Sequence, residues 1–190
     1  MKHLMFFVAG IFLLFSCNTS TTTFSDPQEY NDAIMNIVYS VQYPMDTLEL
    51  ELLQVKKLLE NNPESIINYD QIDTNYLFFL HNRAKKQVKN ALLDIKKISF
   101  DKGDDDFKPM AIEVFKKLDT SLQTNFDTLI YIICNSHQKK SKEVLYKILP
   151  YGKKSYKDFE AAFDSLFVGQ RKFDVKNQYF LQNNYIIFHL

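Results

Sequence analysis

Glycine is scarce in this sequence. Only four glycines occur in 190 residues, at positions 10, 103, 152 and 169, and no two of them lie close together. Phosphate-binding loops, dinucleotide-binding fingerprints and nucleophile elbows need closely spaced glycines, because their backbone turns sharply or approaches the ligand closely. The sequence therefore excludes these three kinds of site in their usual form.

The sequence also lacks an excess of charge of either sign. Its 23 lysines and arginines balance 23 aspartates and glutamates, which gives a formal net charge of zero. Proteins that bind nucleic acid normally carry a basic excess, so we expect no nucleic-acid partner. The remaining composition, 46% hydrophobic and 24% charged, is typical of one soluble globular domain that is long enough to bury a core.

Motifs that hold metals or haem are missing as well. Cysteine is limited to Cys17 and Cys134, and no Cys-x-x-Cys-His motif for covalent haem attachment is present. Helical di-iron sites need a glutamate three residues before a histidine. The last three histidines have Phe78, Cys134 and Ile186 at that position instead. We therefore expect no resident cofactor, no metal site and no catalytic residues.

Two groupings of chemistry-bearing side chains remain. Cys134 and His137 lie one helical turn apart, the spacing of a soft-metal pair or an activated thiol. We expect instead a cysteine at the edge of the core and a histidine favoured by the helix-end dipole. The stretch DKGDDD at 101–106 gathers carboxylates, but an EF-hand needs a glutamate at position twelve, where Ile112 stands. We expect this cluster to cap the following helix.

Tryptophan is absent, whereas 17 phenylalanines and 11 tyrosines make the chain rich in smaller aromatic side chains. At helical spacing such residues are typical of a packed core. The alternative is that some of them line an apolar ligand cavity between helices.

The N-terminus carries a short apolar run. Leu4 to Phe15 follow Lys2, and these twelve residues span only ~18 Å, against ~30 Å for the hydrocarbon core of a bilayer. A cationic start, a short apolar run and a small residue before the cut are typical of a secretory signal peptide.

Leu14-Phe15-Ser16-Cys17 resembles a bacterial lipobox, with leucine three residues before the cysteine and a small residue just before it. The resemblance implies that residues 1–16 are removed as a lipoprotein signal peptide and that lipidation occurs at Cys17. More than one acyl chain at this residue gives stable attachment to a membrane. Cys134 is then the single remaining thiol, so we expect no internal disulfide.

Residues 17–25 are rich in serine and threonine, and we expect them to form a flexible tether. Folding is expected to start at Asp26-Pro27-Gln28-Glu29. Aspartate caps a helix, proline suits the first helical position, and a glutamate three residues after the cap completes a capping box.

Four long helical patterns follow, with apolar residues spaced three or four apart. The first keeps its phase across Pro44, which we interpret as a kink in one helix, and Pro150 and Gly152 predict a kink or break near the start of the fourth. The patterns run from Tyr30 to Leu59, Leu77 to Ile98, Phe107 to Ile133 and Leu145 to Phe180.

No stretch alternates as a β-strand does, apart from residues 185–188. We therefore predict an all-α fold. Residues 26–182 are expected to form an antiparallel up-and-down four-helix bundle with long, partly proline-kinked helices, and residues 183–190 a C-terminal tail.

Two segments carry a likeness to a known family, SFDKGDDDFKPMAIEVFKKLD at 99–119 and FEAAFDSLFVGQRKFDVKNQYFL at 159–181. Together with the DPQEYNDAI start they resemble a set of small all-helical lipoproteins that are frequent in Bacteroidota and labelled surface proteins. The resemblance implies a lipoprotein and a four-helix bundle, and it supplies no catalytic residues. Surface-exported lipoproteins of that phylum often carry acids just after the cysteine, which Asn18 to Thr23 lack, so the membrane face stays open.

These observations lead to two hypotheses about function. The first is a non-enzymatic lipoprotein of the cell envelope, anchored to the outer membrane through Cys17, which presents a helical face to a protein partner. The second is a module that binds a small apolar ligand, a lipid or haem inside the bundle. An enzyme comes third, because no nucleophile–base pair or metal set is visible.

Overall fold

A computed structural model describes residues 21–68, 71–104 and 106–177 of the chain. These residues are mostly helical, which confirms the all-α class, although two short strands are also present. The predicted signal peptide at 1–16, the predicted lipidation site Cys17 and the predicted tail at 183–190 lie outside the described residues.

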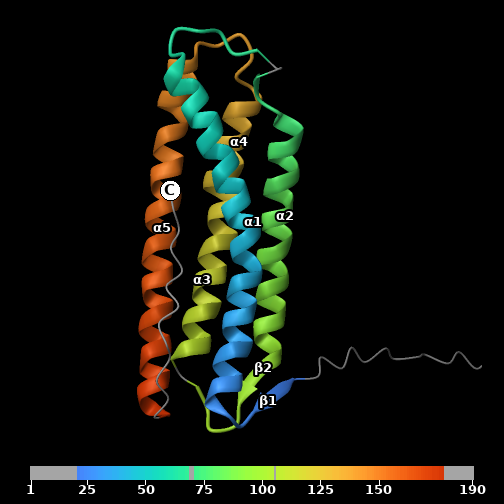
Figure 1. Ribbon diagram of the computed structural model, residues 1–190, viewed down its shortest axis with the longest axis vertical. Helices are drawn as coiled ribbons and strands as arrows, with labels where there is room; N and C mark the ends of the chain where they lie inside the picture. The colour runs from blue at the N-terminus through green and yellow to red at the C-terminus, as the bar shows by residue number, and fades with distance from the viewer. Residues whose placement is uncertain (1–20, 69–70, 105, 178–190) are drawn as a thin grey trace, which may run out of the picture.

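The helices lie side by side along the long axis of the molecule (Figure 1). α1 packs against α2 and α5, and α3 packs against the same two helices. A π-helical segment, η3, joins α3 to α4, so the third predicted helix is present as one continuous rod. The bounds are α1 Pro27–Asn61, α2 Thr74–Asp94, α3 Phe107–Ser121, η3 Leu122–Phe126, α4 Asp127–Cys134 and α5 Ser141–Lys176.

The first helix begins where the sequence predicts. The Asp26 carboxylate accepts hydrogen bonds from the backbone N–H groups of Gln28 and Glu29, at 2.8 and 3.0 Å, and Pro27 occupies the first turn. α1 then continues through Pro44 for 35 residues. α5 likewise continues through Pro150. Both prolines are therefore accommodated inside continuous helices.

The prediction of a flexible tether at 17–25 is wrong for Thr22–Phe24, because these residues form a β-strand. The sequence pattern predicted no strand in this region. β1 (Thr22–Phe24) pairs in parallel with β2 (Ile98–Phe100), in the register Thr22 with Ile98 and Phe24 with Phe100. The two strands lie at the end of the molecule where α1 begins (Figure 1). The pairing depends on contacts between segments 76 residues apart, as in the Thr23–Ser99 hydroxyl pair at 2.8 Å. A local sequence pattern does not show such contacts.

The second helix is also shorter than predicted. The apolar pattern continues to Ile98, but α2 ends at Asp94, and a 3₁₀ turn, η2 (Ile95–Lys97), leads directly into β2. Ile95 and Ile98 stay buried although they have left the helix. The apolar spacing therefore continues beyond the end of the helix, because the core also buries residues of the 3₁₀ turn and the strand that follow it.

Aromatic rings gather at the strand end of the helices. Phe173 of α5 is 1% exposed, and its ring centroid lies 5.3 Å from that of Tyr30 and 5.2 Å from that of Phe100. Phe24 of β1 packs on Tyr30 at 6.2 Å between ring centroids. This aromatic cluster (Phe24, Tyr30, Phe100, Phe107 and Phe173) therefore holds both strands against α1, α3 and α5.

Gly169→Ala is expected to lower the free energy of unfolding by about 1–3 kcal/mol, the usual cost of overpacking. α5 passes so close to the start of α3 that an added Cβ would lie 2.9 Å from the Asp106 carbonyl oxygen and 2.8 Å from Met110 Cγ. A backbone oxygen can move aside only if α3 shifts. Urea unfolding followed by circular dichroism measures the change.

The matched control is Gly152→Ala, in the same helix. There the nearest atom to an added Cβ is Leu129 Cδ1 at 4.0 Å, an ordinary contact distance. We expect this variant to be neutral or more stable by up to ~1 kcal/mol, because alanine is the better helix former. Equal effects of the two substitutions would contradict the close approach of α5 to α3.

Candidate functional site

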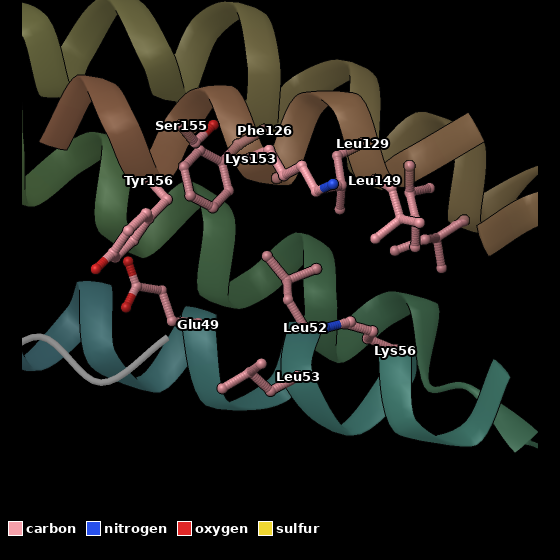
Figure 2. Close-up of a pocket in the computed structure, with 13 residues that line it drawn as sticks. Glu49, Leu52, Leu53, Lys56, Phe126, Leu129, Leu149, Lys153, Ser155 and Tyr156 are labelled. Carbon is pink, nitrogen blue, oxygen red and sulfur yellow. The ribbon is translucent and has the colours of Figure 1, made fainter. Parts of the chain in front are cut away.

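A pocket of about 240 Å³ opens between the second half of α1, the η3–α4 segment and the first half of α5 (Figure 2). An engineered apolar cavity of ~150 Å³ holds benzene, and drug-sized ligands occupy ~300–1,000 Å³, so this volume suits a small molecule. Most of its lining is apolar: Leu52, Leu53, Phe126, Leu129, Ile133, Ile148 and Leu149.

A carboxyl group lies buried at one end of this pocket. Glu49 of α1 is only 3% exposed, and its Oε1 atom has no hydrogen-bond partner. Burial, together with the nearby Asp46 carboxylate, raises the pKa of Glu49 to about 8, so the side chain is mostly uncharged at neutral pH. Tyr156 reaches toward this group from α5 (Figure 2). A buried polar atom without a partner is uncommon and costly, so an explanation is needed for it.

Two lysines lie along the rim of the pocket. Lys153 comes from α5 and Lys56 from α1, and both line the opening away from Glu49 (Figure 2). Lys56 has a long ion pair with Glu60, at 3.7 Å, in which its side chain stays 42% exposed. Within the described part of the chain no ion pair is found for Lys153. The rim is therefore positively charged, while the interior is apolar.

Gly152 leaves space for this pocket. It lies inside α5, where a glycine costs up to ~1 kcal/mol relative to alanine. Unlike Gly169, it is not required by a close backbone approach, because an added Cβ would meet only Leu129 at 4.0 Å. Packing therefore does not require a glycine here, but a large side chain at this position would occupy the pocket.

The π-helical segment η3 forms part of the wall. Its last residue, Phe126, lines the pocket and stacks on Phe159 at 5.7 Å between ring centroids. Beside it, Ser121 donates a hydrogen bond to Ser155, at 3.2 Å, and Ser155 also lines the pocket. π-Helical turns inside α-helices often occur at functional sites. The turn here places an aromatic ring next to the pocket, and Ser155 of α5 adds a hydroxyl group to the same lining.

Of the two groupings considered in the sequence, Cys134 and His137 both line a cavity of only about 10 Å³. Cys134 is half-buried, and burial raises the pKa of its thiol, which is the opposite of activation. The Asp104 carboxylate accepts the backbone N–H groups of Asp106, Phe107 and Lys108, at 2.9, 2.8 and 2.7 Å. This confirms that the acidic cluster caps the third helix. No cluster of three metal-ligating side chains occurs among the described residues.

The residues that now stand out were missed in the sequence. Glu49 lies four residues after Met45 and three before Leu52, so the helical spacing alone places a carboxylate on the apolar face of α1. The sequence therefore contained a signal that could have identified Glu49. The pairing of this face with Gly152 and Lys153 of α5 left no such signal, because it depends on how the two helices cross.

No helix in the described part of the chain combines the length and the apolar character that crossing a bilayer requires. Comparison of the chain with protein-family models, with curated proteins and with solved structures finds no match.

Proposed function

We propose that this protein is a lipoprotein of the cell envelope whose helical body binds a small apolar molecule in the pocket between α1, α4 and α5. The observation that carries the proposal is an apolar space of about 240 Å³ that is lined by Glu49, a buried residue whose Oε1 atom has no hydrogen-bond partner. Ligand sites typically combine an apolar lining with a few placed polar groups. Gly152 supports the proposal because it lines the space without a side chain that would fill it.

The proposal includes an anchor at Cys17 in the outer membrane, after removal of residues 1–16. The lipobox-like residues Leu14 to Cys17 and the likeness to small helical lipoproteins of Bacteroidota support it. The body is proposed to be an antiparallel up-and-down four-helix bundle without enzymatic activity. The side-by-side alignment of its helices along one axis, and the packing of both α1 and α3 against α2 and α5, support this arrangement (Figure 1).

Gly152→Leu is expected to weaken the binding of 1-octanol at least about tenfold, because a leucine side chain at this position fills the pocket. Titration calorimetry with the unmodified chain should show saturable binding at one site. Gly152→Ala is the matched control, and we expect its affinity to stay within about twofold, since a single methyl group leaves most of the space. No saturable binding to the unmodified chain, or equal binding to the leucine variant, would overturn the pocket as a ligand site.

Cys17→Ser is expected to abolish lipid attachment and to leave residues 1–16 in place, because the modified cysteine directs the cut. Fatty-acid labelling in cells and the intact mass of the purified chain measure the two effects. Cys134→Ser, which keeps the lipobox-like residues, is the control and should be labelled and cut normally. A Cys17→Ser chain that is still labelled, or still cut after Ser16, would contradict the anchor.

A second candidate function, presentation of a face to a protein partner, is favoured by exposed aromatic side chains on α1 and α2. Tyr43 is 65% exposed and Phe79 58%, Tyr76 stacks on Phe79 at 6.3 Å, and Arg83 covers the Tyr43 ring at 5.3 Å. A photo-crosslinker placed at Phe79 in intact cells tests this face. A discrete adduct that is absent when the crosslinker replaces Tyr146 on α5 would favour the candidate, and no adduct would remove it.

A further inference from the structure

The two ends of the pocket differ in chemistry, and this difference defines the class of ligand. At the rim, Lys56 and Lys153 present two ammonium groups. At the other end, Tyr156 of α5 reaches toward Glu49 (Figure 2), and the nearby Asp46 carboxylate helps to raise the pKa of Glu49. The η3–α4 wall contributes only apolar side chains here, namely Phe126, Leu129 and Ile133.

The lysine end suits an anion. Lys153 is exposed and has no ion-pair partner within the described residues, and Lys56 has only a long, exposed pair with Glu60. An ammonium group that donates to a carboxylate forms a charge-assisted hydrogen bond, which is stronger than a neutral one. A cationic head group would instead meet two like charges at this rim.

The Glu49 end suits a neutral polar group. Burial keeps this carboxyl mostly protonated at neutral pH, so it neither repels an anion nor attracts a cation strongly. A protonated carboxyl has one O–H donor and further acceptor capacity. A hydroxyl group on the ligand can donate to or accept from the Glu49 carboxyl group, which lines this end of the pocket.

The separation of the two ends sets the length of the ligand. Glu49 and Lys56 are seven residues apart on α1, which corresponds to about 10.5 Å along the helix axis. An apolar chain between an anionic end and a hydroxyl end therefore has to cover roughly this span, over Leu52 and Phe126. This is the length of a medium-chain acyl group rather than of a phospholipid tail.

We propose that the pocket binds a medium-chain hydroxylated carboxylic acid, with its carboxylate between Lys56 and Lys153 and its hydroxyl group on Glu49. This inference rests on the proposed function, since it names the class of the apolar ligand. The carboxylate supplies the charge at the rim, the chain covers the apolar wall, and the hydroxyl pairs with the buried carboxyl.

The test is titration calorimetry at pH 7 with the mature chain, residues 17–190, carrying Cys17→Ser, so that neither an attached acyl group nor the apolar residues 1–16 compete. The probes are 8-hydroxyoctanoate, octanoate, 1,8-octanediol and 8-amino-1-octanol. We expect the hydroxy acid to bind at least about tenfold more tightly than octanoate and than the diol, and the amino alcohol to bind weakest. Lys153→Met should reduce affinity for the hydroxy acid about tenfold and leave the diol unchanged, whereas Lys147→Met, exposed on α5 outside the pocket, should change neither.

Equal affinity for the hydroxy acid and the diol, or for the hydroxy acid and octanoate, would overturn this inference while leaving an apolar pocket. Tighter binding of the amino alcohol than of the hydroxy acid would also overturn it, because the site would then prefer a cationic group to a carboxylate. No saturable binding of any of the four probes would overturn the proposed function itself.

Discussion

Replacing Phe173 by alanine is expected to lower the free energy of unfolding by about 3–5 kcal/mol, the range for removing a buried phenylalanine ring from a core. The ring is 1% exposed and contacts Tyr30, Phe100 and Phe107 at centroid distances of 5.3, 5.2 and 6.0 Å. Its loss leaves a cavity at the point where both strands meet the helices, and α3 and α5 are too closely packed nearby to collapse into it. Urea unfolding monitored by circular dichroism measures the change.

The control is Tyr146→Ala on the same helix. Tyr146 is 82% exposed, and we expect its replacement to change stability by no more than ~0.5 kcal/mol. If Phe173→Ala cost no more than this control, the aromatic cluster would not be the packing centre of the strand end.

Glu49→Gln is expected to remove most of a pH dependence of stability. In the unfolded chain this carboxyl loses its proton near pH 4.5, whereas in the folded chain burial raises its pKa to about 8. The folded chain therefore binds the extra proton between these pH values, so the free energy of unfolding falls as pH rises from 4.5 to 8. At ~1.36 kcal/mol per pKa unit, the fall is on the order of 4–5 kcal/mol. Glutamine does not ionise, so the variant is expected to lack this fall in the free energy of unfolding.

Other groups titrate in the same interval, so the measured quantity is the difference between the unmodified chain and the variant at each pH. Burial also raises the pKa of Asp174, to about 6, and this contribution cancels in the difference. Glu160→Gln, at an exposed position of α5, is the matched control and should give a flat difference. A flat difference for Glu49→Gln as well would show that water or a side-chain movement solvates this carboxylate in the folded chain.

Helices were predictable here because each one carries its own signal. The spacing of apolar residues across Pro44 predicted one helix through the proline, and α1 is continuous there. The aspartate cluster before Phe107 predicted the cap that Asp104 provides. The strands were not predictable, because three residues such as Thr22–Phe24 have no periodicity and are fixed by partners at Ile98–Phe100. The π turn at Leu122–Phe126 was also hidden, because it barely alters the apolar spacing.

The candidate site shows the same division. The sequence predicted the general alternative of an apolar cavity between helices but none of its residues. Glu49 was visible as a carboxylate on an apolar face, whereas the roles of Gly152 and Lys153 depend on α5 bringing them to the same pocket. The pair that the sequence did bring forward, Cys134 and His137, was attractive only because the two residues are close in the chain.

The pairing of β1 with β2 also limits how far the folded body can stand from a membrane. Thr22 is fixed in β1 only five residues after Cys17, and an extended chain of that length reaches at most ~18 Å. With the proposed anchor at Cys17, β1 would be held within ~18 Å of the bilayer surface. Glu49 lies 22 residues after Pro27 in α1, which places it about 33 Å along the helix axis from the strand end. A body that stands with this axis pointing away from the bilayer would then load the pocket from the aqueous compartment and not directly from the acyl chains of the membrane.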